Sequence, residues 1–302
     1  MIENRKIFYI LSTVLIIISI IGITVFKLPL GIDFKGGSLM EVGFLPDEDG
    51  SITILSREDL TSALSDIDLG SINIQQGGDD SLILRFRDVD EETHQEILTK
   101  INEASEFEIE EKQFQSVGPV IGRETISKSA WAMGLVLVMI VVYVAWAFRR
   151  ISYPLGSTRY GIIALITLFH DIIITVGFFA IFTHFKGTEV GVPFIAALLT
   201  IVGYSVNDTI VVFDRVRENI LRFGNQRDFN ELVSASVKES VVRSLNTSLT
   251  TLLVLFAVFF FGGETIHNFI FTLIVGIAIG TYSSIFIASP ILVSWAGRLR
   301  KA

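Results

Sequence analysis

The chain of 302 residues contains no cysteine, and it has only 4 histidines and 6 prolines. Without cysteine, the chain can form neither a disulfide bond nor a thiolate metal site. The histidines are scattered without the spacing of a zinc site, and no catalytic triad, P-loop or Walker motif is present. We therefore expect a protein that is not an enzyme, with no catalytic residue, metal or cofactor, which takes its energy from a gradient or a partner.

Charged residues are absent from several long stretches of the sequence. Half of the residues are apolar, and the mean hydropathy is +0.58. Residues 7–26 form an uncharged run of 20 residues, and a helix needs roughly 20 apolar residues to cross a bilayer. This run is too long for the apolar region of a cleavable signal peptide, so we expect a retained first span. The other candidate spans are 130–148, 161–185, 190–213, 243–261 and 266–296.

The pattern predicts a polytopic α-helical membrane protein with six transmembrane helices. The last run is longer than one span needs, so we expect it to tilt or to extend along the interface. Gly276 and Gly280 in this run form a small-xxx-small pair, whose expected role is close helix packing.

Lysine and arginine are nearly absent from alternate loops, and this bias predicts the orientation of the chain. Basic residues favour short cytoplasmic segments. If the N-terminus is cytoplasmic, the short outer loops carry only Lys186. The cytoplasmic segments then carry Arg5, Lys6, Arg149, Arg150, Arg159, Arg215, Arg217, Arg222, Arg227, Lys238, Arg298, Arg300 and Lys301. We predict a multi-pass protein of the cytoplasmic (inner) membrane with both termini inside, and anionic membrane lipids are candidate partners of the basic loops.

The segment 28–128 is then extracytoplasmic, and it holds most of the acidic residues. It contains 22 acidic and 8 basic residues, a net charge of −14 that leaves +6 for the remainder of a chain whose total is −8. Nucleic acid is not an expected partner, because a surface that binds phosphates needs clustered lysine and arginine. The predicted organisation is a first transmembrane helix (1–28), an extracytoplasmic α+β domain (29–128) and helices two to six with short loops (129–302).

The extracytoplasmic segment contains strand and helix patterns in the order β-α-β-β-α-β. Polar and apolar residues alternate at 38–44, 81–87 and 107–114, and a short strand is expected at 71–75. Ser56 and Asp59 form a weak capping box before the first helix, and 90–104 is an amphipathic second helix. The glycines and aspartates of 77–80 indicate a hairpin turn. This order of elements is that of the ferredoxin-like fold.

Few ionisable residues lie inside the predicted spans, and these are the candidates for function. Ionisable residues are costly in a bilayer, and they usually face the protein interior or a water-filled path. His170 and Asp171 lie roughly 15 Å from the start of the third span, near the bilayer midplane. Thr167, Asp171 and Thr175 repeat every four residues as one polar stripe. The pattern fits either a proton-coupling role or a pair that only pins neighbouring helices.

Asp208 and Arg243 form a second candidate pair. Asp208 follows Asn207 near the inner end of the fourth span, and Arg243 begins the fifth span at a comparable depth. Because consecutive spans run antiparallel, we expect Asp208 and Arg243 to be in contact. An ion pair that exchanges partners when a proton arrives would act as a switch, so we predict that Asp208 titrates with Arg243 as its counter-charge. Alternatively, Arg243 extends only to the inner lipid headgroups.

Three groups of residues resemble the signatures of one known family. The first is Gly-Ile-Asp-Phe-Lys-Gly-Gly at 31–37, and the second is Ser-Val-Gly-Pro-Val-Ile-Gly-Arg-Glu at 116–124. The third comprises His170-Asp171 with 203–215 and 243–250. Together they cover essentially the whole chain and resemble the SecF family, accessory membrane subunits of the bacterial Sec protein translocase within the RND superfamily. The signature residues expected to be structural are Gly31, Asp33, Gly36, Gly37, Gly118, Pro119 and Gly122, because glycines permit tight turns.

The resemblance implies a function and a set of partners. It implies an RND-like half of six helices that pairs with SecD, associates with the SecYEG channel and uses the proton-motive force to promote translocation and release of exported polypeptides. YajC-like and YidC-like accessory proteins are further partners that it implies. The essential membrane carboxylate of the family falls on Asp208, and its essential membrane arginine falls on Arg243. The chain begins at its own Met1 with an uncleaved span, so it resembles the separate-subunit form.

Two alternatives use the same sequence features. An RND-type antiporter of small molecules and protons would have similar buried charges, although it should carry a larger porter domain than this one. A passive scaffold of a membrane complex would need none of the charges at Asp171, Asp208 and Arg243.

Overall fold

The computed structural model describes residues 4–46, 52, 54–78, 80–105, 108–149, 155–223 and 226–299. Met1, Arg150, Arg300 and Lys301, which are named above, lie outside this part of the chain, as do Asp79 of the predicted turn 77–80 and Phe107 of the predicted strand 107–114. The chain divides into two compact units. We call Leu30–Ala130 the sheet unit, and Met1–Pro29 with Trp131–Ala302 the helical unit.

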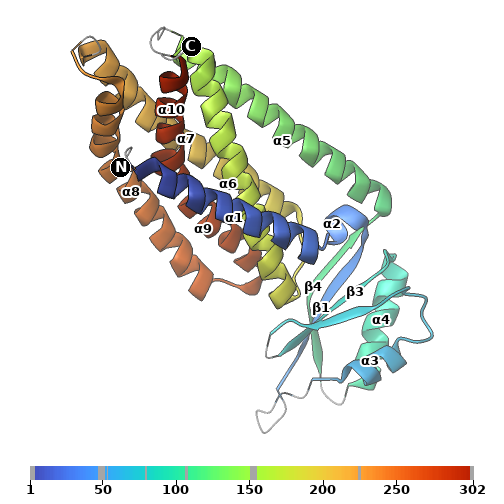
Figure 1. Cartoon of the computed structure of the whole chain (residues 1–302). Coiled ribbons are helices and arrows are strands. Elements are labelled where there is room, and N and C mark those ends of the chain that lie inside the picture. Colours follow the sequence, from blue (N-terminus) through green and yellow to red (C-terminus); the bar gives the residue numbers. More distant parts are fainter. Residues whose placement is uncertain are drawn as a thin grey trace. The chain divides into compact units, whose positions relative to one another are not determined.

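Six helices in the described part of the chain are long and apolar enough to cross a membrane. The fold class predicted from the hydrophobic runs, six such helices with a small α+β unit between the first two, is therefore confirmed (Figure 1). The first five are α1 (Arg5–Phe26), α5 (Pro119–Ala147), α6 (Ser157–Lys186), α7 (Val192–Phe223) and α8 (Phe229–Phe261). The last consists of α9 (Glu264–Ser283), the π-helical turn η2 (Ser284–Ala288) and α10 (Ser289–Leu299).

The helices extend beyond the apolar runs that predicted them. Helix α7 ends at Phe223 rather than at Phe213, and α8 begins at Phe229 rather than at Arg243. Asp228 caps the start of α8, because its side chain accepts a hydrogen bond from the amide of Asn230 at 3.1 Å. An apolar run marks only the part of a helix suited to hydrocarbon, whereas the backbone bonds of a helix continue through polar turns.

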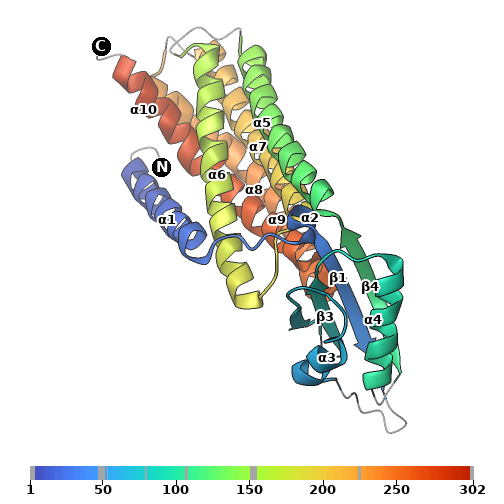
Figure 2. The same ribbon diagram turned by 90° about the vertical axis from the view of Figure 1, so that its right-hand side faces the viewer.

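Helices α6, α7 and α9 form the interior of the helical unit, and Figure 2 shows α6 between α1 and α7. Two of the interhelical contacts depend on glycine. A Cβ atom at Gly177 of α6 would overlap Ser19 of α1, and one at Gly276 of α9 would overlap Ile201 of α7. Helices α5 and α8 instead expose large apolar side chains such as Leu135 and Leu253, as lipid-facing helices do.

The sheet unit contains one antiparallel sheet of four strands in the order β2-β3-β1-β4. The strands are β1 (Gly37–Phe44), β2 (Asn73–Gln76), β3 (Ser81–Phe86) and β4 (Ile109–Val117). Helices α3 (Arg57–Ala63) and α4 (Glu91–Ala104) cover one face (Figure 1). The core between them contains Met40, Val42, Phe44, Leu60, Leu64, Leu69, Ile74, Leu82, Leu84, Phe86, Ile97 and Ile101. This arrangement is the ferredoxin-like fold predicted from the element order.

Helix α3 begins at its predicted cap, and α4 also has a capping residue at its start. The hydroxyl of Ser56 donates to the carboxylate of Asp59 at 2.6 Å and accepts from the Asp59 amide at 3.2 Å. Asp90 caps α4 in the same way through Thr93. The sequence pattern did not predict α2 (Ile32–Lys35), a single helical turn that precedes β1.

Candidate functional site

Asp171 lies in the middle of α6 and is completely buried. Its Oδ1 atom is 2.8 Å from Nδ1 of His170. Its Oδ2 atom accepts hydrogen bonds from the hydroxyls of Ser205 at 2.5 Å and Ser283 at 2.7 Å. Because Ser205 belongs to α7 and Ser283 to α9, this one carboxyl group connects three membrane-spanning helices.

Asp208 on α7 is also buried, with 6% of its surface exposed. Its Oδ2 atom accepts a hydrogen bond from the hydroxyl of Ser284 at 3.2 Å. The hydroxyl of Ser244 on α8 lies near the same carboxyl group without meeting hydrogen-bond geometry among the described residues. The two buried carboxyl groups are therefore contacted by consecutive serines, Ser283 and Ser284, at the junction of α9 and η2.

Within the described part of the chain, no lysine or arginine forms an ion pair with Asp171 or Asp208. A carboxylate in a membrane interior is costly unless it is paired or hydrogen-bonded. Here serine hydroxyls and one imidazole supply the hydrogen bonds. Either carboxyl group can therefore gain or lose a proton without breaking an ion pair to lysine or arginine within the described chain.

The structure does not contain the expected contact between Asp208 and Arg243. Arg243 is exposed on α8, and no ion pair joins it to Asp208 in the described residues. The predicted depth is nevertheless right, since Arg243 lies between two bridges from α7 to α8, namely Arg215 to Glu239 and Tyr204 to Ser248.

The direction of the Arg243 side chain accounts for the missing contact. The buried polar residues of α8 are Ser236, Ser240, Ser244 and Ser248, which follow one another every four residues. One residue corresponds to a rotation of about 100° around a helix axis, so Arg243 points well away from the direction of Ser244. Depth can be estimated from the sequence, whereas the rotation of a helix about its axis depends on its neighbours.

Asn207 lies outside the buried site as well. It is exposed on α7, as is Thr200, whereas Asp208 is buried, so the neighbours Asn207 and Asp208 lie on different faces of the helix. The structure thus has exposed polar side chains in the apolar parts of α7 and α8. They are Thr200 and Asn207 on α7 and Arg243, Asn246, Thr247 and Thr250 on α8, and we call them the exposed polar surface.

The sequence reasoning missed three residues of the buried site, namely Ser205, Ser283 and Ser284. Ser284 lies one helical turn beyond Gly280, on the small-residue face of Gly276 and Gly280. A Cβ atom at Gly280 would lie 3.0 Å from Cβ of Ser205, so this face does pack closely against α7. The signal that could have identified the serines is two adjacent hydroxyls in an apolar run, which need polar partners when buried.

The two short family-like signatures pack against each other in the sheet unit. Gly36 and Gly37 have φ angles of +81° and +121°, which side chains rarely allow. A Cβ atom at Gly122 would lie 2.7 Å from the carbonyl oxygen of Phe34, so that position also requires glycine.

The polar residues of these signatures have structural contacts too. Asp33 accepts a hydrogen bond from the amide of Gln115 at 3.2 Å. Pro119 begins α5, and its Cα would lie 2.8 Å from a Cβ atom at Gly36. Gly31 precedes α2 and accepts from the amide of Phe34 at 3.1 Å, whereas Gly118 has open space around it. Apart from Gly118, these residues contribute to one tight junction of backbone.

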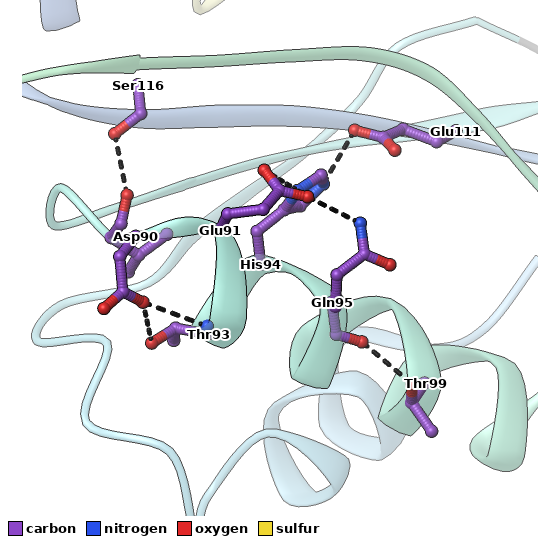
Figure 3. Close-up of polar contacts among 9 residues, drawn as sticks. Asp90, Glu91, Thr93, His94, Gln95, Thr99, Glu111 and Ser116 are labelled. Carbon is purple, nitrogen blue, oxygen red and sulfur yellow. Dashed lines mark hydrogen bonds and ion pairs between the residues drawn. The ribbon is translucent and has the colours of Figure 1, made fainter.

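A separate titratable cluster surrounds α4 of the sheet unit (Figure 3). The buried ring of His94 lies between two carboxylates, with Nδ1 3.2 Å from Glu91 and Nε2 2.9 Å from Glu111. Hydrogen bonds from the Gln95 amide and from His94 lower the pKa of Glu91. Among the residues that the structure describes, no group of three or more histidine or acidic side chains could hold a metal ion.

Comparisons with known proteins agree with this architecture. The family model of "Protein export membrane protein SecD/SecF, C-terminal" matches residues 97–298, and that of the "SecD/SecF GG Motif" matches residues 21–44. The chain belongs to the SecD/SecF family, on its SecF branch. It is 40% identical to the protein translocase subunit SecF of Thermobaculum terrenum, over 97% of this chain and 93% of that protein. SecF of Petrotoga mobilis is 39% identical over 99% of this chain and 96% of its own length.

The SecF assignment extends to a solved structure. The crystal structure of SecDF from Thermus thermophilus, described as a translocon-associated membrane protein, matches 98% of this chain with a TM-score of 0.80 and 30% identity. This chain spans 38% of that longer SecDF chain. The relatives are named translocase subunits, and the six long apolar helices make this SecF-family chain a multi-pass membrane protein.

Proposed function

We propose that this chain is the SecF subunit of a SecD–SecF complex, which associates with the SecYEG channel and uses the proton-motive force to promote protein translocation and release. The names of its relatives support a role in protein export. This chain spans 38% of the SecDF chain of Thermus thermophilus, which supports a pairing with SecD that supplies further helices.

The observation that carries the proton-driven part of the proposal is the pair of buried carboxyl groups. Asp171 and Asp208 are held by hydroxyls from neighbouring helices and by His170, without an ion pair to lysine or arginine in the described chain. A proton that arrives from the outer side therefore changes hydrogen bonds between helices directly. One proton that crosses 100 mV supplies about 2.3 kcal/mol, which biases a two-state equilibrium roughly fiftyfold.

The exposed polar surface supports the pairing with SecD. A polar band that includes Arg243 and Asn207 is unfavourable against lipid and becomes favourable when a partner helix covers it. In the proposed mechanism, Arg243 forms an ion pair with an acidic group in the assembled complex. Protonation of Asp208 then changes how the helices pack at the contact with SecD.

The proposed orientation puts both termini in the cytoplasm and the sheet unit outside the cytoplasmic membrane. The basic residues at the ends of the spans support it, because Arg5, Arg159 and Arg298 would lie on the same side. In this orientation the sheet unit is placed where an exported polypeptide emerges.

An Asp208→Asn variant tests the proposal. Asparagine keeps the size of the side chain but cannot take up the proton, so we expect the gradient-dependent part of protein translocation to be lost in vesicles that contain SecD and SecYEG. Translocation without an imposed gradient should be unchanged. Asp214→Asn is the matched control, because Asp214 is an exposed residue of the same helix that pairs with Arg217.

The other outcomes decide between the alternatives. Full gradient dependence in the Asp208→Asn vesicles would refute the proton switch. Stimulation that survives neutralisation of Asp171, Asp208 and Arg243 together would show a passive scaffold. Gradient-driven movement of a small molecule in vesicles without other Sec proteins would show an antiporter.

A further inference from the structure

The consecutive serines at the end of α9 each have two acceptors for one proton. The hydroxyl of Ser283 lies 2.7 Å from the carboxylate of Asp171 and 3.1 Å from the carbonyl of Gly280. The hydroxyl of Ser284 lies 3.2 Å from the carboxylate of Asp208 and 3.1 Å from the carbonyl of Thr281. A serine hydroxyl carries a single donor hydrogen, so it satisfies only one of its two acceptors fully at a time.

The segment that begins at Ser284 is a π-helical turn, η2, which separates α9 from α10. Such turns are rare, occur mostly as single turns inside α-helices and are frequent at functional sites. Their hydrogen bonds join residues five apart, so a change to the ordinary spacing of four alters the rotation of the following helix. The hydroxyl of Ser289, the first residue of α10, lies 3.5 Å from the carbonyl of Ser284, the first residue of η2.

We propose that Ser283 and Ser284 are positioning residues that transmit the protonation of Asp171 and Asp208 to the π-helical turn η2. The proposal rests on the proposed function, because it assigns the element that responds to the proton. It identifies η2 as the place where a chemical change at either carboxyl group becomes a change in helix geometry.

The exchange of hydrogen bonds follows from the positions of the donors. While a carboxyl group is ionised, the serine donates its hydrogen to it. When a proton binds the carboxylate, its new O–H donates to the serine oxygen, and the serine hydrogen turns to the carbonyl of Gly280 or Thr281. Serine bonds to carbonyls of the preceding turn destabilise and bend helices. No other bond is broken, and the added proton stays on the carboxyl group.

The neighbouring helices contribute few other ionisable groups to this segment. Helix α6 contributes His170, whose ring centre lies 6.3 Å from that of Tyr282 on α9 itself. The remaining tyrosines near the segment are hydrogen-bonded to hydroxyls, namely Tyr204 to Ser248 and Tyr9 to Ser294. Helix α8 contributes Ser244 and Ser248 on this side, while Arg243 is exposed, and on α10 Arg298 is exposed.

Hydrogen exchange in the full chain, bound to SecD in lipid nanodiscs, tests the proposal. We expect protection of the amides of 280–289, corrected for intrinsic rates, to change about tenfold from about pH 5 to about pH 9. Ser283→Ala combined with Ser284→Ala should remove this pH dependence. Ser284→Thr, which keeps the hydroxyl, should retain it. Ser240→Ala is the matched control, because the buried hydroxyl of Ser240 donates to the carbonyl of Ser236 and touches neither carboxyl group.

Two results would overturn the proposal. One is a protection of 280–289 that does not depend on pH in the parent chain. The other is a pH dependence that survives in the double alanine variant, which would make the serines merely structural. Asp171→Asn and Asp208→Asn should each remove part of the dependence, whereas His170→Asn alone should not abolish it.

The result of the hydrogen-exchange experiment and the result of the export assay can be told apart. If Asp208→Asn leaves gradient-driven export intact while η2 still responds to pH through the serines, the proton switch of the proposed function is refuted and the serine mechanism stands. If gradient-driven export requires Asp208 but the protection of η2 does not change with pH, the proton switch stands and the serine mechanism is refuted.

Discussion

At the scale of single residues, the structure depends on positions where a side chain would not fit. Gly177 is the clearest case, because a Cβ atom there would overlap both the side chain and the backbone of Ser19 on α1. A flexible side chain can move aside, whereas a backbone atom moves only with its helix. The contact between α1 and α6 thus requires glycine at this position.

We predict that Gly177→Ala destabilises the helical unit by about 1–3 kcal/mol, the usual cost of overpacking. The measurement is the thermal unfolding midpoint of the purified chain in detergent. Gly134→Ala is the control, since Gly134 on α5 has open space around it, and alanine is favoured over glycine in a helix by roughly 0.5–1 kcal/mol. A midpoint that falls equally in both variants would contradict the close contact.

At the scale of elements, the sheet unit shows how local charge holds a helix end. The Asp90 carboxylate accepts from the Thr93 hydroxyl at 2.7 Å and from the Thr93 amide at 3.0 Å (Figure 3). These two hydrogen bonds lower the pKa of Asp90 below its usual range. They stabilise the ionised carboxylate, so the cap contributes stability while Asp90 is charged.

The sign of the pH dependence follows from this lowered pKa. The contribution of Asp90 should be complete above about pH 4, the unfolded value, and should be lost as the pH falls through the lower folded pKa. We predict that Asp90→Ala makes hydrogen exchange in the first turn of α4 roughly fivefold faster at neutral pH. At acid pH the difference from the parent chain should disappear. Glu92→Ala, at an exposed position of the same turn, should have little effect, and an equal effect would exclude a specific cap.

At the scale of the whole molecule, the main feature is the exposed polar surface, which the described part of the chain does not cover. Apolar side chains such as Leu249 and Leu253 cover most of the outer face of α8, yet Arg243 and Asn246 are exposed on the same helix. Such polar groups are energetically costly where a helix faces lipid, whereas the side chains of a partner helix can bind them. We therefore propose that SecD contacts the chain at this surface.

We predict that Arg243→Leu weakens co-purification of SecD. Loss of the guanidinium would leave a buried polar group of the partner unpaired, at a cost of about 1–3 kcal/mol, which is at least roughly fivefold in affinity. Arg222→Leu is the control, because Arg222 is exposed near the end of α7 beside Phe223. Unchanged binding of SecD by the Arg243→Leu chain would instead favour an arginine that extends to the lipid headgroups.

The sequence by itself determined the features that depend on local pattern. Six apolar runs predicted six spans, the period of two or of 3.6 residues predicted the strands and helices of the sheet unit, and the cap at Ser56 located the start of α3. The burial of Asp171 and Asp208 was also predictable, because a charge in an apolar run must avoid lipid.

Only the tertiary structure decided which side chains meet. Whether Arg243 faces Asp208 depends on the rotation of α8 about its axis, which contacts with α7 and α9 determine. The serines Ser205 and Ser283 become partners of Asp171 only because α7 and α9 pack closely on each other and against α6, and the small residues Gly276 and Gly280 permit the contact between α7 and α9. Hydrogen bonds between helices depend on distances of a few tenths of an ångström, and such distances arise from packing rather than from the order of residues along the chain.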